Sequence, residues 1–216
     1  FAERGMIEHD NGHPILQRCI MRIAERHTDR HVYQDGHGSD PLTGCYDRRQ
    51  MLTRITKTFE AVKISRRPAG YIVVGIDKMS FVNEAMGMEA GDAVLRGVAE
   101  RLKLAIPSRA TLARVGGDMF GVLLPDPLGD EIKKLGEQIL QIFRDQPIVT
   151  RVSALHITVS IGGVKIPANA RNATEAMIHA EQSLHEARHR GRNLFVEYVE
   201  SPQRVQQHRQ LLELSE

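Results

Sequence analysis

Two adjacent glycines, Gly116 and Gly117, constrain the fold of this chain more than any other feature. They separate two apolar segments, residues 111–115 and 120–124. Gly-Gly between two β-prone segments predicts a tight β-hairpin, because such a turn requires positive φ and glycine adopts it without steric cost. Asp118 follows the glycines directly, and a carboxylate at the tip of a rigid hairpin is well placed to hold a divalent cation against a phosphate. The hairpin is therefore predicted to carry a ligand site.

The two residues after this carboxylate are Met119 and Phe120. A thioether cannot supply metal or proton chemistry of the kind that a second carboxylate would supply. The hairpin therefore has the form of a metal-binding site that lacks its second carboxylate.

Composition excludes several classes of protein. The chain has 216 residues, 41% hydrophobic and 26% charged, with a formal net charge of +2. This charge is too small to indicate a nucleic-acid partner. The two cysteines give no disulfide framework and suit a reducing cytoplasm, and the longest apolar stretch, residues 71–76, is far shorter than a membrane span. We expect a cytoplasmic fragment, excised from a protein that could be membrane-anchored elsewhere.

Strand and helix patterns alternate along the rest of the chain. Apolar residues at helical spacing predict helices within 51–62, 94–102, 132–142 and 174–188, with a short helix at 81–86. Asp92 is expected to be the N-cap of its helix, after a loop at 87–91. Strands are predicted at 71–76, 156–164 and 194–198. The pattern predicts an α/β fold with a central mixed sheet flanked by helices.

Five motifs in register resemble the GGDEF family, the diguanylate cyclase domain of bacterial cyclic di-GMP signalling. They are Asp-Pro-Leu-Thr-Gly at 40–44, the segment 76–92, the hairpin at 114–120, Val-Ser-Ile-Gly at 159–162, and Arg188 with Gly-Arg-Asn at 191–193. The resemblance implies a palm-like fold similar to nucleotidyl cyclases, with a mixed, mostly antiparallel sheet. It also implies three parts: a PAS-like tail and signalling linker (1–36), the GGDEF domain (37–199), and a helical linker (200–216) toward an EAL phosphodiesterase domain.

The nucleotide-binding residues that the resemblance implies are largely present. Asn83 and Asp92 match the two residues that read the guanine edge, and a carboxylate can accept hydrogen bonds from guanine N1–H and N2–H₂. Arg188 and Arg192 match a Lys and an Arg on the γ-phosphate side. The alternative interpretations are structural: Asn83 and Asp92 as caps, and the two arginines as a solvated helix end.

The metal-binding residues that the resemblance implies are largely absent. Gly75 stands at the position of the family's metal-holding Asp, and Ser80 at that of a phosphate-contacting Lys. Asp77 and Asp118 remain as weak, residual metal ligands. One carboxylate and one carbonyl hold Mg²⁺ weakly, because hard cations require several oxygen ligands. No cofactor is therefore expected to be required, apart from Mg²⁺ that could accompany GTP.

The product-inhibition motif of the family, Arg-x-x-Asp, is also absent. The corresponding window, residues 107–110, reads Pro-Ser-Arg-Ala, so no inhibitory site is expected. Arg114 remains as a secondary contact for cyclic di-GMP.

Three hypotheses follow from these residues. The first is a non-catalytic GGDEF domain that regulates adjacent PAS-like and EAL-like domains, with GTP as its possible ligand. The second is an active diguanylate cyclase whose rearranged metal site uses Asp77 and Asp118. The third, compatible with the first, is a dimerisation unit, and a homodimer is expected in the full-length protein.

Overall fold

The computed structural model describes residues 38–150 and 153–200. In chain order, the named elements are α2 (Arg48–Ser65), β1 (Ala69–Ile76), α3 (Met79–Met86), α4 (Met88–Ala105), β2 (Thr111–Arg114), β3 (Met119–Pro125), α5 (Glu131–Asp145), β4 (Ile148–Val149), β5 (Ala154–Leu155), β6 (Val159–Ile166), α6 (Ala173–His189) and β7 (Phe195–Glu197). Among these described residues, no helix is long and apolar enough to cross a lipid bilayer.

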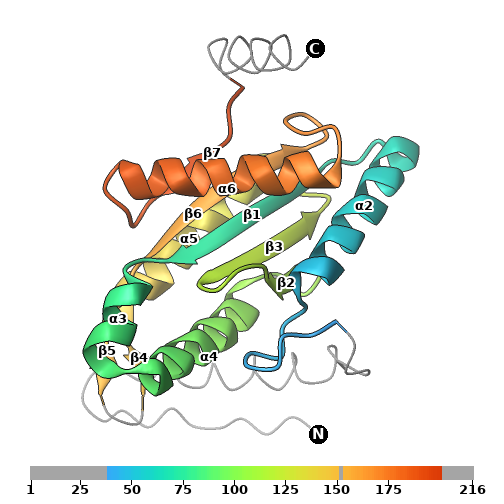
Figure 1. Ribbon diagram of the computed structural model, residues 1–216. Coiled ribbons are helices and arrows are strands. Elements are labelled where there is room, and N and C mark those ends of the chain that lie inside the picture. The colour runs from blue at the N-terminus through green and yellow to red at the C-terminus, as the bar shows by residue number, and fades with distance from the viewer. Residues whose placement is uncertain (1–37, 151–152, 201–216) are drawn as a thin grey trace, which may run out of the picture. The chain divides into compact units, whose positions relative to one another are not determined.

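The main sheet has five strands in the order β2-β3-β1-β6-β7 (Figure 1). Its pairs are antiparallel except for β6 and β7, which run parallel. This confirms the predicted mixed, mostly antiparallel sheet. β4 and β5 form a separate two-stranded hairpin that the sequence did not predict.

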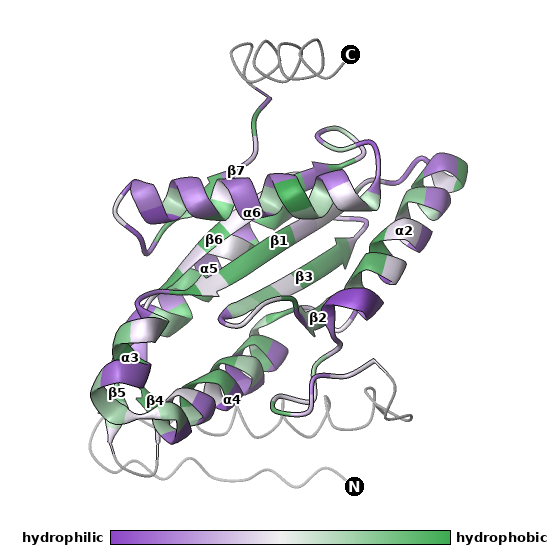
Figure 2. Ribbon diagram, viewed as in Figure 1, coloured by the Kyte–Doolittle hydropathy of each residue, from purple (hydrophilic) through white to green (hydrophobic). Residues whose placement is uncertain are grey.

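Strand β1 lies at the centre of the sheet, and every one of its residues is buried. Its side chains alternate between two apolar clusters. Ile72 and Val74 face the cluster shared with α4 and α5, whereas Tyr71 and Val73 face the cluster shared with α2 and α6. The continuous apolar run at 71–76 is thus explained by helices on both faces. Figure 2 shows hydrophobic residues along β1 and β3 and many hydrophilic residues on the surrounding helices.

The close packing of α6 on the sheet depends on Gly162 of β6. A Cβ at this position would overlap the backbone carbonyl oxygen of Ala180 and the amide nitrogen of Leu184. The absence of a side chain therefore lets the helix backbone lie directly against the strand, as Figure 1 shows for α6 across β6 and β1.

One predicted boundary, the N-terminus of the helix containing Asp92, was wrong. Helix α4 begins at Met88, with Gly87 at its N-cap position, so Asp92 lies in the second turn and caps nothing. Gly87 takes a φ of 83°, which separates α3 from α4 in a single residue. Gly91 is buried within the helix rather than in a loop. A side chain at this position would overlap the Asn83 side chain, which occupies the space where a Cβ would lie.

The other boundaries shift by a few residues. The strand predicted at 156–164 runs over Val159–Ile166, and the last strand is Phe195–Glu197 rather than 194–198. The predicted PAS-like tail and the helical exit beyond residue 200 lie outside the described residues, and both stay predictions.

Candidate nucleotide site

The hairpin turn differs from the predicted two-glycine turn. Four residues, 115–118, connect β2 to β3, and the amides of Val115 and Gly116 both donate to the Met119 carbonyl at 2.9 and 3.3 Å. Neither Gly116 nor Gly117 has a positive φ, so the conformational reason for the glycines was wrong. At Gly116 a Cβ would lie 2.5 Å from Met119 Cε, the flexible end of a side chain, so another residue would require Met119 to shift.

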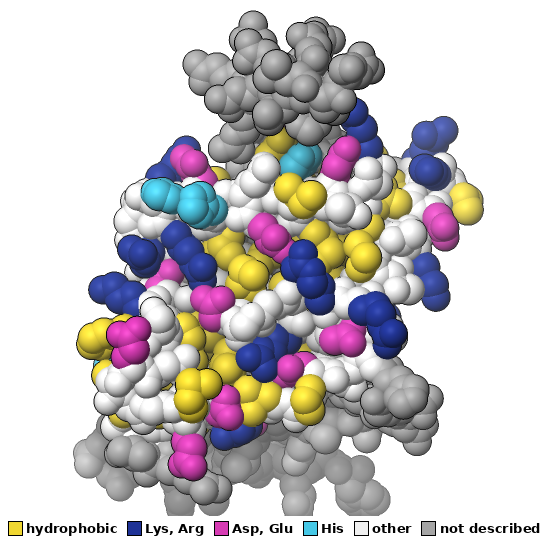
Figure 3. Space-filling view, viewed as in Figure 1, with side chains coloured by type: hydrophobic (Ala, Val, Ile, Leu, Met, Phe, Trp, Pro, Cys, Tyr) yellow, Lys and Arg dark blue, Asp and Glu magenta, His cyan; other side chains and the backbone are white. Residues whose placement is uncertain are grey.

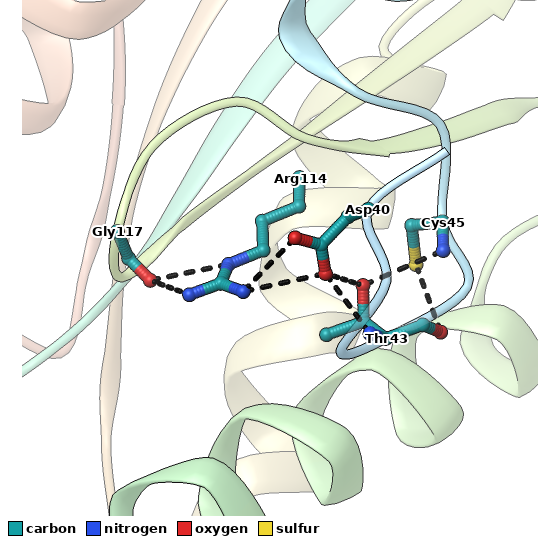
Figure 4. Close-up of polar contacts among 5 residues, drawn as sticks. All are labelled: Asp40, Thr43, Cys45, Arg114 and Gly117. Atoms are coloured by element: carbon teal, nitrogen blue, oxygen red, sulfur yellow. Dashed lines mark hydrogen bonds and ion pairs between the residues drawn. The ribbon is translucent and has the colours of Figure 1, made fainter. Parts of the chain in front are cut away.

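Arg114 fixes the tip of this hairpin to the segment before α2 (Figure 4). Its Nε and Nη2 donate to the Gly117 carbonyl at 3.3 and 2.7 Å, and its Nη1 donates to the Asp40 carboxylate at 3.1 and 3.3 Å. Asp40 also accepts from the amide and hydroxyl of Thr43 at 2.9 and 2.7 Å. The guanidinium predicted as a secondary contact for cyclic di-GMP is thus engaged in holding the turn.

The same network perturbs the titration of Asp40. Burial by itself would raise the pKa of this carboxyl group, but the hydrogen bonds from Thr43 and the charge and hydrogen bonds of Arg114 outweigh burial and hold the pKa below its ordinary value. The carboxylate form is therefore stabilised in the folded protein.

Arg188, near the C-terminus of α6, reaches the opposite side of the hairpin. Its Nη2 donates to the Ile76 carbonyl at 3.0 Å and to Asp118 Oδ2 at 2.8 Å. The guanidinium also covers Gly75, where a Cβ would lie 2.6 Å from Arg188 Nη2. The fold therefore brings the end of β1, the hairpin and α6 together around one cation.

Asp77, the other predicted metal ligand, is directed toward β6. It is buried, and its two carboxylate oxygens accept from the hydroxyls of Thr158 at 2.7 Å and Ser160 at 2.8 Å. The Asn193 amide also approaches one of these oxygens at 3.3 Å. Both oxygens of Asp77 are thus satisfied by the fold.

These contacts decide whether a divalent cation fits the residues present. Asp118 is paired with Arg188, and Asp77 is committed to β6. Within residues 38–150 and 153–200, no cluster of three or more His, Cys, Asp or Glu side chains could hold a metal ion. The residues therefore do not fit Mg²⁺ without rearrangement.

The predicted guanine-binding side chains, by contrast, make no hydrogen bond within the described part of the chain. Asn83 of α3 packs against Gly91 of α4, and its buried Oδ1 has no hydrogen-bond partner among the described residues. Asp92 lies one residue further along α4 and is half-buried, and its side chain likewise makes no hydrogen bond or ion pair within the described part of the chain. An unsatisfied buried polar group is costly, so Asn83 is a polar side chain of this region whose hydrogen bonding the described fold leaves incomplete.

Arg192 follows α6 in the loop before β7. Its backbone has a φ of 67°, and its amide donates to the Ala187 carbonyl at 3.1 Å. The exposed guanidinium has no hydrogen bond or ion pair to the residues that the structure describes. It is therefore available to an anionic ligand, as the resemblance implied. The exposed Ser80 supplies only a neutral hydroxyl.

Three residues that support the site were not predicted. Arg144 of α5 holds the loop after α6 by donating to the Asn193 side chain and carbonyl at 3.0 and 2.8 Å. Thr158 and Ser160 hold Asp77. Ser160 could have been found from the sequence, because it is a polar residue within an apolar strand pattern. Arg144 gives no such signal.

Two surface hollows are lined by residues other than the guanine-binding pair. One, of about 380 Å³, is lined by residues of α6 and the segment 195–199, and the other, of about 360 Å³, lies between α3 and the segment 155–158. Neither is lined by Asn83, Asp92 or Arg188. On the face shown in Figure 3, Lys and Arg side chains are interspersed with acidic ones.

Comparisons with known proteins identify relatives of this chain. The family described as "Diguanylate cyclase, GGDEF domain" matches residues 38–194. The uncharacterized protein YhcK of Bacillus subtilis is 33% identical over 80% of this chain and 50% of its own length. The probable diguanylate cyclase DgcT of Escherichia coli is 32% identical over 76% of this chain and 37% of its own length. This chain thus spans half or less of both relatives.

The fold also matches that of solved GGDEF domains. The GGDEF domain of TpbB, also named YfiN, from Pseudomonas aeruginosa superimposes with a TM-score of 0.74 at 23% identity, covering 78% of this chain and 99% of that structure. This similarity supports the fold assignment.

Proposed function

The chain belongs to the GGDEF family of diguanylate cyclase domains, and from this premise we propose that it is a non-catalytic member that binds GTP as a regulatory module in cyclic di-GMP signalling. The observation that carries this proposal is a contrast within the site. The groups suited to guanine and phosphate have free hydrogen-bonding capacity, whereas the groups suited to a metal are absent or engaged in internal contacts.

The guanine side of this contrast rests on Asn83 and Asp92. Their side chains have no hydrogen-bond partners among the described residues, and Asn83 Oδ1 is buried. An amide and a carboxylate supply the acceptors that the guanine edge requires. Arg192, together with Nε and Nη1 of Arg188, supplies donors for phosphate oxygens.

The catalytic side rests on Gly75 and Met119. Both stand where the resemblance implies acidic side chains, and the remaining acid, Asp118, is paired with Arg188. Loss of one preorganised electrostatic contact typically costs about 2–4 kcal/mol of transition-state stabilisation. Two such losses lower a rate by roughly three to six orders of magnitude, since about 1.4 kcal/mol corresponds to a factor of ten.

We propose that GTP binding to this domain regulates neighbouring PAS-like and EAL-like domains in the full-length protein. We also propose that the full-length protein is a homodimer.

Calorimetry tests the binding part of the proposal. GTP is expected to bind the chain, and Asp92→Ala or Asn83→Ala should weaken binding by about tenfold or more, because each removes a base contact. Glu84→Ala, which changes an exposed neighbour of Asn83, is the matched control and should bind like the parent. Absence of heat up to millimolar GTP would leave a purely structural domain.

Incubation with GTP and Mg²⁺ or Mn²⁺, followed by chromatography, tests the catalytic part. No cyclic di-GMP is expected. Detectable turnover would instead support an active cyclase with a rearranged metal site.

A further inference from the structure

The guanidinium of Arg188 occupies the point where β1, the hairpin and α6 converge. We propose that it takes the place of a divalent cation and excludes one, so that a nucleotide triphosphate is held here without Mg²⁺. The exclusion of a divalent cation is a property of the chain without nucleotide. The statement about the triphosphate rests on the proposed GTP binding.

The contacts of Arg188 are those that a cation would make. One nitrogen, Nη2, donates to the Ile76 carbonyl at 3.0 Å and to the Asp118 carboxylate at 2.8 Å. A backbone carbonyl and a carboxylate are oxygen ligands of the type that Mg²⁺ prefers. Both are occupied by the arginine.

Space at the site depends on the residue at position 75. A Cβ on Gly75 would lie 2.6 Å from Arg188 Nη2 and 2.9 Å from Leu184 Cδ2, closer than ordinary contact. Glycine therefore permits the guanidinium to lie over the end of β1. An aspartate here would force the guanidinium to shift and would then pair with it, so its carboxylate is free to bind a metal only when Arg188 is also removed.

Electrostatics acts against a divalent ion while the arginine is in place. Guanidinium remains protonated throughout the physiological pH range, so the positive charge beside Asp118 is permanent. A metal ion would have to approach this charge and compete for the same two oxygens. Asp77, which follows Ile76 in the sequence, already accepts hydrogen bonds from Thr158 and Ser160.

The same guanidinium retains donors for a phosphate. Nη2 uses both of its hydrogens on Ile76 and Asp118, whereas Nε and Nη1 make no hydrogen bond to the described residues. Together with the exposed Arg192, these donors suit the oxygens of a triphosphate. The cation that holds the hairpin to β1 can therefore also contact the nucleotide.

A Mn²⁺ titration followed by electron paramagnetic resonance tests the exclusion without nucleotide. The parent chain is expected to leave Mn²⁺ free at millimolar concentrations, and the double variant Gly75→Asp/Arg188→Ala to bind it at least tenfold more tightly. The matched control is Gly75→Asp/Arg190→Ala, which makes the same change in charge at the same helix end but retains Arg188. Arg190 pairs with Glu186 and touches neither Ile76 nor Asp118.

Two results would overturn the exclusion: sub-millimolar Mn²⁺ binding by the parent, or equal binding by the double variant and its control. If the double variant does not fold, Arg188→Met alone is compared with the parent. This variant keeps the bulk of the side chain and removes its charge, so it should also gain Mn²⁺ affinity, and no gain would count against the proposal.

Calorimetry with GTP, in Mg²⁺ and in excess EDTA, tests the consequence for the nucleotide. The two affinities are expected to agree within about twofold, and Arg188→Met should weaken binding in EDTA by about tenfold. Binding that requires Mg²⁺ would overturn the proposal. Absence of binding in both buffers would refute the proposed GTP binding, while the Mn²⁺ titration would still decide the exclusion.

Discussion

Gly75 of β1 and Met119 of β3 are directly paired across the antiparallel ladder. Met119 packs against the cluster shared by α2 and α6, and the guanidinium of Arg188, on α6, lies over Gly75. The two positions at which the resemblance implied acids are thus neighbours on one face of the sheet. Their replacement by glycine and methionine makes that face suitable for an arginine and an apolar contact.

Restoring the acids should restore catalysis in part. The triple variant Gly75→Asp/Met119→Glu/Arg188→Lys is expected to form cyclic di-GMP from GTP, because it supplies two carboxylates and shortens the side chain that fills the site. Each recovered electrostatic contact is worth about 2–4 kcal/mol, so the rate should rise by at least a thousandfold over the parent. Chromatography of the nucleotide products measures it. Met119→Glu alone should remain inactive, and equal activity of that single variant and the triple variant would contradict the prediction.

Asp77 should affect stability rather than ligand binding. Asp77→Ala removes the acceptor of the buried Ser160 hydroxyl and of the half-buried Thr158 hydroxyl, and should lower the free energy of unfolding by about 1–3 kcal/mol. Urea denaturation measures this change. GTP affinity, measured well below the denaturation midpoint, should stay within about twofold of the parent. A large loss of affinity with unchanged stability would indicate that Asp77 is a ligand.

Gly162 and Gly117 should respond differently to alanine. Gly162→Ala places a methyl group against the backbone of α6 and should lower the free energy of unfolding by about 1–3 kcal/mol or more, because a helix backbone cannot yield as a side chain can. Gly117→Ala meets no atom within 4 Å, and Gly117 has no positive φ. Its effect should stay within about 0.5 kcal/mol. Thermal denaturation of both variants provides the test, and a similar loss at Gly117 would show that the turn needs glycine for its conformation.

Acid should weaken the attachment of the hairpin to the segment before α2. The pKa of Asp40 is lower in the folded protein than its ordinary value of 3.8. Its stabilising contribution is therefore fully present above that value and is lost as the pH falls below 3.8 toward the folded pKa. Urea denaturation of the parent and of Asp40→Asn, between about pH 6 and pH 3, provides the test. The difference in stability between them should shrink as the pH falls, and a constant difference would contradict the assignment.

Periodicity and composition were sufficient to predict the α/β fold, the helices and the main hairpin, but not the separate β4–β5 hairpin. A buried strand such as β1 can be recognised from its apolar run, and an amphipathic helix such as α5 from its spacing, because both patterns reflect which face is buried. The motifs also placed Asn83, Asp92, Asp118 and Arg188 among the candidate ligands.

The boundary at Asp92 was wrong because local rules favour an acidic N-cap after glycines. Helix α4 instead begins at Met88 after Gly87, and the buried Gly91 packs against the Asn83 side chain. The reason assigned to Gly116 and Gly117 was also wrong. The connection between the strands is longer than two residues, and neither glycine has a positive φ.

The sequence by itself determined which chemical groups this protein has: a hairpin carboxylate, an amide–carboxylate pair, two arginines near the C-terminus of α6, and no acid at Gly75. Only the tertiary structure decided how those groups are used. It paired Asp118 with Arg188, committed Asp77 to β6 and left Asn83 Oδ1 without a partner. The reason is that hydrogen bonds form between groups far apart in the chain, such as Asp118 and Arg188, and their geometry is set by the packing of the sheet and helices.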